Sequence, residues 1–564
     1  MQGIQTQVLV VGAGPVGLTA AMDLASRGIE VVVAETRSAG EPPNVKCNHV
    51  SARSMEVFRR LGIVRRVRDG GLPADFPNDC AYRTAVVGRE LTRIPIPSRA
   101  DRYTATQGPD TGWPTPEPPH RINQIYLEPI LFACARERSQ IRILNRVQVE
   151  HFNQSRDGVV AHGRDLDSGD EITIAADYLI GCDGGRSMVR KAIGARFAGT
   201  EVVQRVQSTY IYAPQLKDMI VQKPAWMTMS LNPRRCGTTV AIDGEDRWLI
   251  HNHLASNETD FESVDRDWAL RAILGVDDRF RYEVLSKEDW IGRRLVADRF
   301  RDRRAFICGD AAHLWIPYAG YGMNAGIADA VDLCWILAAV LQGWASPAML
   351  DAYEAERQPI TEQVSQYAMN HALAVMDQRR AVPPEIEADG PAGDEVRDRV
   401  GRAAYDLNVQ QYCCAGLNFG YYYDRSPIIA YDGETPPPYS MGSFTGSTVP
   451  GARVPHAWLP DGRSLLDGLG PAYTLVRFDT SIDVAALTEA AAQSRVPLAV
   501  LDVDRNRATP RAPESLLMVR PDTHIAWRGD AVPREPLRLF DRLRGAAVEA
   551  SSQRRVRAGE VADT

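Results

Sequence analysis

The sequence has no excess of basic charge. Its 65 lysines and arginines are outnumbered by 72 aspartates and glutamates, which leaves a net charge of −7. A nucleic-acid partner needs a basic face, so we expect none. Lysine itself is scarce, with five residues against 60 arginines, a bias that we attribute to the nucleotide composition of the gene rather than to function.

The nine cysteines follow neither a disulfide nor a metal-ligand pattern. No CxxC pair and no Cys/His ligand spacing occurs among positions 47, 80, 134, 182, 236, 308, 334, 413 and 414. In a long chain with no recognisable signal peptide, this distribution is typical of reduced, mostly buried thiols. We therefore expect no bound metal, no disulfide framework and a cytoplasmic location.

Long hydrophobic runs are missing too. The most apolar run beyond the N-terminal segment is LCWILAAVL at 333–341, far shorter than the roughly 20 residues that span a bilayer. We therefore expect no membrane partner. The apolar and charged fractions, 44% and 24%, are ordinary for a globular protein, and a chain of 564 residues is expected to form two or three domains.

A glycine-rich turn follows the first apolar strand. Residues 8–17, VLVVGAGPVG, have glycines at 12, 14 and 17. Gly12 permits a tight turn, Gly14 lets the backbone approach a pyrophosphate, and Gly17 lets the next helix lie close to the strand. That helix begins near Pro15 and directs its free N–H groups and positive dipole end at the phosphates. The segment predicts a dinucleotide site in a Rossmann-like unit.

A second strand, IEVVVAE at 29–35, ends in an acidic residue. Glu35 follows Gly14 by 21 positions, close to the roughly 20 expected for a carboxylate that binds a ribose 2′-hydroxyl. A carboxylate there would repel a 2′-phosphate, so the expected ligand is an ADP unit without one. NAD and FAD both contain that unit, and this segment does not separate them.

The period of the apolar residues changes along the chain. Helices are expected at 15–27, 51–61, 121–139 and 322–342, and buried strands at 178–184 and 304–310. Residues 200–290 alternate in polarity as antiparallel strands do, which predicts a second domain inserted into the first. Residues 95–120 are rich in Pro, Gly and Thr and predict a long loop over the surface or over a site.

A further glycine-rich segment surrounds residue 310. The strand at 304–310 ends at Gly309, and Asp310 is placed to hydrogen-bond a sugar-like hydroxyl. Gly320 and Gly322 allow close backbone approach, and a helix begins there with its dipole directed at the ligand. A helix N-terminus at the N1–O2 end of a flavin favours its anionic reduced form. Together with GCDGGRS at 181–187, these segments predict FAD.

The three segments resemble those of the class A flavoprotein monooxygenases, the single-component FAD-dependent aromatic hydroxylases. GAGPVG, CDGGRSMVRKAIG and GDAAH…PxxGxGMNxGIxDAxxLxW occur in the family's order and spacing over about 370 residues. The resemblance implies an α/β fold, with a Rossmann-like FAD-binding domain and an inserted antiparallel-sheet substrate domain. No second GxGxxG is present, as in a family that binds NAD(P)H transiently in a surface groove.

The resemblance also implies most of the cofactor contacts. Asp310 would bind the ribityl chain, and Asp183 would serve both FAD and nicotinamide. Arg53 and Gln124 would reach the FAD phosphates or the ribityl chain. The expected FAD-contacting residues are Gly12, Gly14, Pro15, Val16, Gly17, Glu35, Thr36, Arg37, Arg53, Gln124, Asp183, Gly184, Asp310, Pro317, Gly320, Gly322, Met323 and Asn324. The chain departs from the family pattern at Ala319, Asp332 and Ile336, where Gly, Asn and Lys are usual.

The last part of the chain resembles the thioredoxin-like α/β domain of the phenol-hydroxylase branch. RPDTHIAWRG at 520–529 matches its closing signature, and strands are expected at 473–478, 496–503 and 515–521. No cysteine follows Cys414, which excludes dithiol chemistry there, so we expect a structural role or a homodimer contact. The expected units are a monooxygenase core at 1–395, a linker at 396–440 and the thioredoxin-like domain at 441–564. Within the core, the FAD-binding segments are about 1–75, 120–199 and 287–345, and the substrate domain is about 76–119 and 200–286, with helices to 395.

The implied reaction is hydroxylation of a phenolic or polycyclic aromatic substrate. NAD(P)H reduces FAD, O2 adds at flavin C4a, and the hydroperoxide transfers an electrophilic oxygen to the ring. The base that deprotonates the substrate is not readable from the sequence. The candidates are Tyr210, Tyr212, His251 and His253 on the presumed substrate sheet and His49 near the flavin edge, although residues of these types are more often simply packed or exposed.

Other readings stay open at this point. Baeyer–Villiger insertion or epoxidation of a polycyclic natural product would use the same flavin hydroperoxide. A flavin-bearing protein that binds a reactive intermediate without oxygenating it would share the cofactor motifs. A flavin halogenase is less well supported, because its WxWxIP element is absent and lysine is scarce.

Overall fold

The first sheet contains the parallel strands of the nucleotide-binding unit. The structure, a computed structural model, describes residues 3–46, 48–504 and 514–547. The strands are β1 (Gly3–Val11), β2 (Val31–Glu35), β5 (Ile141–Asn145), β6 (Val147–Gln154), β7 (Val159–Asp165), β8 (Glu171–Gly181), β14 (Arg301–Asp302) and β15 (Ala305–Ile307). The order is β14-β15-β8-β1-β2-β5, and β15, β8, β1, β2 and β5 are parallel. β7 and β6 extend it by antiparallel pairing from β8.

Helices lie against the parallel strands, and β2, which is buried along its whole length, is an apolar run up to its last residue, Glu35. Helix α1 (Pro15–Ser26) packs against α8 (Gly322–Leu341) and α4 (Gln124–Arg136). All five residues of β2 are buried. The helices expected at 15–27, 121–139 and 322–342 are confirmed within a few residues at each end, as is that at 51–61 by α2 (Ala52–Arg60).

The second sheet is almost entirely antiparallel, as the alternating polarity of 200–290 predicts. Its strands are β3 (Cys80–Arg83), β4 (Glu90–Ile94), β9 (Phe197–Tyr212), β10 (Met227–Ser230), β11 (Gly237–Ala241), β12 (Arg247–His253), β13 (Glu283–Ala297) and β16 (His313–Trp315). They follow the order β16-β13-β9-β12-β11-β10-β3-β4, and β3 with β10 is the parallel pair. β16 pairs with β13 soon after β15 ends in the first sheet. The segment around residue 310 therefore crosses from one sheet to the other.

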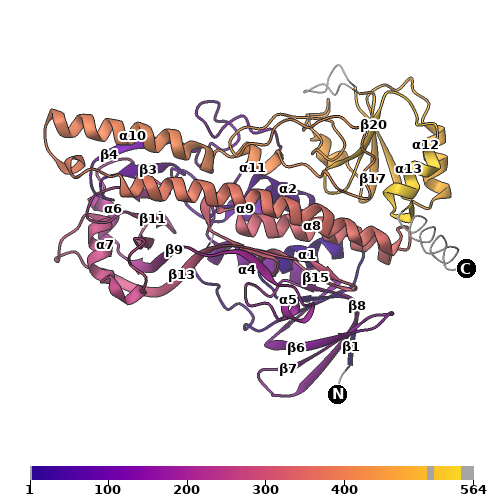
Figure 1. Ribbon diagram of the computed structural model, residues 1–564, viewed down its shortest axis with the longest axis horizontal. Helices are drawn as coiled ribbons and strands as arrows, with labels where there is room; N and C mark the ends of the chain where they lie inside the picture. Colours follow the sequence, from indigo (N-terminus) through magenta and orange to yellow (C-terminus); the bar gives the residue numbers. More distant parts are fainter. Residues whose placement is uncertain (1–2, 47, 505–513, 548–564) are drawn as a thin grey trace, which may run out of the picture.

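Helices α9 (Asp351–Arg380) and α10 (Pro391–Tyr412) run with α8 across one side of the molecule (Figure 1). The expected linker at 396–440 is corrected here, because α10 continues through its first 17 residues, to Tyr412, and α11 (Ala415–Phe419) follows. The buried positions of α10 recur at helical spacing, but most of them are not large apolar residues: Gly393, Arg397, Gly401, Ala404, Asn408 and Tyr412. A search for apolar periodicity therefore misses this helix. Its Gly401 lies so close to β4 that a Cβ there would be 2.3 Å from the Leu91 carbonyl oxygen.

The C-terminal unit has a four-stranded sheet of its own, β18-β17-β19-β20. A parallel β-α-β unit of β17 (Tyr473–Arg477), α12 (Ala485–Gln493) and β18 (Leu498–Asp502) precedes an antiparallel hairpin of β19 (Leu516–Val519) and β20 (Ile525–Gly529). Helix α13 (Pro536–Leu543) packs on α12. This arrangement confirms the expected α/β unit with its closing hairpin, which lies at one end of the molecule (Figure 1).

The remaining helices are short: α3 (Val64–Asp69), α5 (Met188–Ala192), α6 (Gln215–Met219) and α7 (Arg266–Leu274). The Pro-rich segment at 95–120 contains neither a helix nor a strand. Among the described residues, α8 is the one helix long and apolar enough to cross a membrane, and 83% of its most apolar window is buried inside the protein. It serves as the central helix of the first domain.

Candidate active site

The three glycines of the first turn have different surroundings. Gly12 has a φ of +105°, and a Cβ on it would lie 2.4 Å from the carbonyl oxygen of Cys182. A Cβ on Gly17 would lie 2.0 Å from the carbonyl oxygen of Gly12. A Cβ on Gly14 would meet no atom within 4 Å. Gly12 and Gly17 are thus required by packing within the protein, whereas Gly14 borders open space at the N-terminus of α1, as a pyrophosphate site requires.

Glu35, at the end of β2, ties this turn to a polar network. Its carboxylate accepts hydrogen bonds from the backbone N–H groups of Ala13 (2.7 Å) and Arg37 (2.9 Å). Burial alone would raise the pKa of Glu35, but these bonds and the Arg37 guanidinium hold it below its ordinary value. Arg37 also pairs with Glu128 at 2.5 Å, and Glu128 accepts a hydrogen bond from Gln124. Glu35 is therefore ionised and rigidly held beside the glycine turn.

Asp310 lies where the first sheet meets the second. Gly309 before it has a φ of +60°, and the Asp310 side chain is open to a cavity. The surrounding protein raises the pKa of the Asp310 carboxyl above its ordinary value, while His313 and Lys46 act in the opposite direction. An acceptor in this position suits a ligand hydroxyl.

The loop before α8 is locked by Asn324. Its side-chain oxygen accepts hydrogen bonds from the Ser51 N–H and the Ser54 hydroxyl, both at 2.8 Å. Its amide group donates to the carbonyl oxygens of His49 (3.1 Å) and Gly320 (2.7 Å). Asn324 thus shapes the loop through its buried side chain and is not part of the cavity wall. The free N–H groups of the first turn of α8 begin beside this loop.

One cavity of about 560 Å³ joins the two glycine-rich segments. Gly14, Pro15 and Val16 line one part of it, and Asp310 lines the next. Gln124, Gly184, Pro317, Gly320, Gly322 and Met323 from the expected set also line it. The cavity continues over the second sheet, where Trp226, Met229 and Trp290 form apolar walls. Segments some 300 residues apart therefore face one space, and the cradle at Gly14, the acceptor at Asp310 and the loop before α8 fit FAD.

Several expected cofactor residues lie elsewhere. Arg53 faces the C-terminal unit, where it donates to the Thr523 hydroxyl (2.5 Å) and the Asp522 carbonyl oxygen (3.0 Å). Asp183 caps helix α5, accepting from the Ser187 hydroxyl (2.5 Å) and two backbone N–H groups. Both side chains are therefore occupied by contacts within the protein and do not line the cavity. Gly12, Gly17, Glu35, Thr36 and Arg37 are likewise not among the residues that line the cavity.

The structure separates the candidate bases into two groups. His49, His251 and His253 line the cavity, whereas Tyr210 and Tyr212 at the end of β9 do not. Burial, reinforced by Arg379, lowers the pKa of His251 to about 4 and that of His253 well below the ordinary value. The Ser208 hydroxyl bonds His251 Nδ1 at 2.7 Å, and the Thr238 hydroxyl bonds His253 Nε2 at 3.0 Å. Both imidazoles are thus neutral hydrogen-bonding groups at pH 7.

Sequence reasoning missed several wall residues. Among those lining the cavity are Lys46, Arg121, Trp290, Arg379 and Tyr412. They come from a loop, the position just after the Pro-rich segment, β13, α9 and α10, and no local motif marks them. Lys46, one of five lysines in the chain, is close enough to Asp310 to favour its ionised form.

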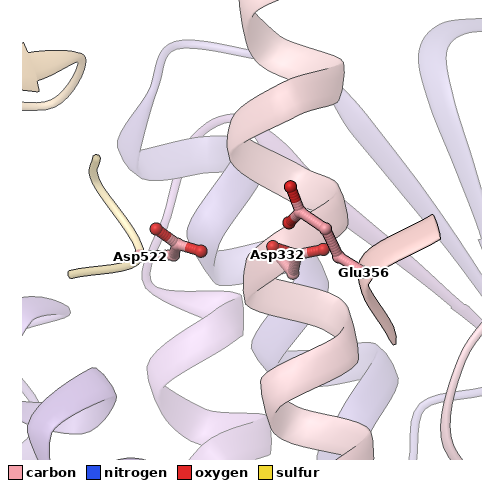
Figure 2. Close-up of side chains that lie close together, drawn as sticks. All are labelled: Asp332, Glu356 and Asp522. Atoms are coloured by element: carbon pink, nitrogen blue, oxygen red, sulfur yellow. The ribbon is translucent and has the colours of Figure 1, made fainter. Parts of the chain in front are cut away.

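A cluster of buried carboxylates joins the core to the C-terminal unit. Asp332 on α8, Glu356 on α9 and Asp522 have oxygens within 4.8 Å of one another (Figure 2). Arg520 donates to all three, at 2.9, 2.6 and 2.7 Å. Because a guanidinium already serves these oxygens, we assign the cluster to docking of the C-terminal unit. Asp332, where the family usually has Asn, is therefore a buried contact between units rather than a minor departure.

Comparisons with known proteins agree with this geometry. Residues 5–368 match the family described as FAD binding domain, and residues 447–547 match that described as aromatic-ring hydroxylase, C-terminal. Tetracenomycin B2 monooxygenase-dioxygenase of Streptomyces olivaceus is 30% identical, over 96% of this chain and 98% of its own. Phenol 2-monooxygenase of Pseudomonas sp. (strain EST1001) is 29% identical, over 98% and 95%. The solved structure of the rebeccamycin biosynthetic enzyme RebC with reduced flavin has a TM-score of 0.86 and 34% identity, over 97% of this chain and 100% of RebC.

Proposed function

The chain belongs to the family of FAD-dependent aromatic-ring monooxygenases, and on this premise we propose that it hydroxylates a phenolic or polycyclic aromatic substrate with NAD(P)H and O2. The observation that carries the proposal is the single cavity shared by Gly14, Asp310 and the antiparallel sheet. A dinucleotide dehydrogenase has no need of a flavin-sized space continuous with an apolar compartment.

The residues around the cavity have separable tasks. Gly14 and the N-terminus of α1 would hold the diphosphate, Asp310 the ribityl hydroxyls, and the loop at 317–323 the ring system. Bound FAD supplies the redox chemistry, taking electrons from NAD(P)H and activating O2. The apolar walls keep water from the reacting atoms.

A substrate hydroxyl would find a partner in His253. Its Nδ1 is buried and has no hydrogen-bond partner among the described residues, while its Nε2 is held by Thr238. A neutral imidazole in this position accepts a hydrogen bond from a phenol and increases the electron density of the ring. His253 is therefore our choice among the candidate bases.

We also propose a cytoplasmic location, supported by the eight cysteines of the described part of the chain, all of which are free thiols. The C-terminal unit, with its own sheet, is our candidate for a homodimer contact.

The test is coupled turnover. The purified protein should be yellow, with absorbance near 450 nm, roughly the flavin band. An accepted phenol or polyketide-type aromatic should accelerate NAD(P)H oxidation and yield one hydroxylated product per NAD(P)H. NAD(P)H oxidation without product for every aromatic compound tested would refute hydroxylation and favour a binding role.

A further inference from the structure

The substrate part of the cavity has more positive than negative charge. The acidic residues on the cavity wall are Glu288 and Asp310, and the basic ones are Lys46, Arg121 and Arg379. Lys46 pairs with Glu288 at 2.9 Å, and Asp310 lies at the flavin end. Among the described residues no ion pair joins Arg121 or Arg379 to a carboxylate, and each has one buried terminal nitrogen without a hydrogen-bond partner there. Two guanidinium charges on this wall are therefore uncompensated.

Arg121 is only 5% exposed. Its guanidinium lies over the Trp226 ring, 4.6 Å from the centroid, and one nitrogen donates to His49 Nδ1. Its other terminal nitrogen is buried and has no hydrogen-bond partner within the described part of the chain. A buried charge of this kind is costly unless it is paired, so this nitrogen indicates a missing anionic or carbonyl partner in the cavity.

Arg379 belongs to the last turn of α9, and one of its terminal nitrogens is also buried without a hydrogen-bond partner in the residues that the structure describes. The next residue, Arg380, points away and pairs with Asp377 at 3.3 Å. The nearby imidazoles of His251 and His253 do not neutralise the charge of Arg379, because both rings are uncharged at pH 7. The two arginines thus leave a positive potential between apolar walls.

We propose that the substrate is an aromatic carboxylate whose ionised acid group pairs with Arg379, while Arg121 adds positive potential from a second wall. This inference rests on the proposed function and narrows its substrate class. A carboxylate accepts two parallel N–H bonds from a guanidinium and so satisfies the unpaired nitrogen. A neutral phenol would leave both charges uncompensated.

The experiment compares acids with their neutral amides. The FAD-bound protein is titrated by calorimetry with benzoate, 2-naphthoate and anthracene-2-carboxylate, and with the corresponding amides and phenols. At least one acid should bind about tenfold or more tightly than its amide, the ratio expected for one charge-assisted contact. If no acid of the series reaches that ratio, or if the matching phenol binds as tightly as the acid, the inference is wrong.

Three variants locate the effect. Arg379→Gln should abolish the preference for the acid while amide affinity and FAD content stay unchanged, and Arg379→Lys should restore part of it. Arg380→Gln is the matched control, since this side chain is 61% exposed on the same helix turn, and it should retain the full preference. A preference that survives Arg379→Gln would refute the assignment. Hydroxylation of neutral phenols without any preference for acids would refute this inference alone, whereas a protein without FAD would refute the proposed function.

Discussion

Alanine substitutions at two glycines of the first turn should have opposite effects. Gly14 has a φ of −72°, which any residue adopts, and a Cβ there would meet no protein atom within 4 Å. Gly14→Ala should therefore leave the free energy of unfolding unchanged or raise it by up to about 1 kcal/mol, because alanine restricts the unfolded chain. Gly17→Ala places a methyl group 2.0 Å from the Gly12 carbonyl oxygen and should destabilise the protein by roughly 1–3 kcal/mol or more.

FAD affinity should distinguish the two variants further. The methyl group of Gly14→Ala would occupy the space assigned to the diphosphate and weaken at least one charge-assisted N–H contact, worth about 1.5–3 kcal/mol. The dissociation constant for FAD should then rise by roughly 10- to 100-fold. The assays are urea unfolding of the apoprotein and FAD titration followed by flavin fluorescence. Wild-type FAD affinity in a normally folded Gly14→Ala protein would show that the diphosphate does not lie at this turn.

Three further predictions concern single side chains. Asp310→Ala should lose most bound FAD, measured by absorbance after gel filtration, with Asp310→Asn retaining part of it; full occupancy in the alanine variant would contradict the ribityl assignment. Arg520→Gln should lower the free energy of unfolding by about 3–5 kcal/mol, because it leaves buried carboxylates uncompensated. Arg477→Gln, which breaks a pair with a half-exposed partner, should have a much smaller effect, because solvent screens that pair; equal losses would refute the cluster's role. The folded-state pKa of His251, about 4 against an ordinary 6.5, means that the unfolded chain binds the proton more readily. The contribution of His251 to the free energy of unfolding should thus be full above pH 6.5 and fall by about 1.4 kcal/mol per pH unit down to about pH 4. In urea unfolding, His251→Asn should remove this part of the pH dependence. An unchanged pH dependence would contradict the neutral buried imidazole.

Features that depend on neighbouring residues were readable from the sequence. The turn at Gly12 needs a positive φ and Gly17 needs close helix contact, and both demands are met within one short segment. The alternation of residues 200–290 predicted the antiparallel sheet, and the glycine-rich segments with Asp310 predicted FAD. Helix α10 escaped detection because its buried stripe consists mainly of Gly, Arg and Asn rather than large apolar residues.

Which side chains face the ligand was decided by tertiary packing. Arg53 was expected to contact FAD, but its side chain bonds Thr523 instead. The Asp183 carboxylate caps helix α5. Lys46, Arg121 and Arg379 line one cavity only because a loop, the position just after the Pro-rich segment and α9 converge there. Backbone conformation and polarity period are local properties that the amino-acid sequence determines by itself. The surroundings of a charge depend on segments hundreds of residues away, and they exist only once the chain has folded.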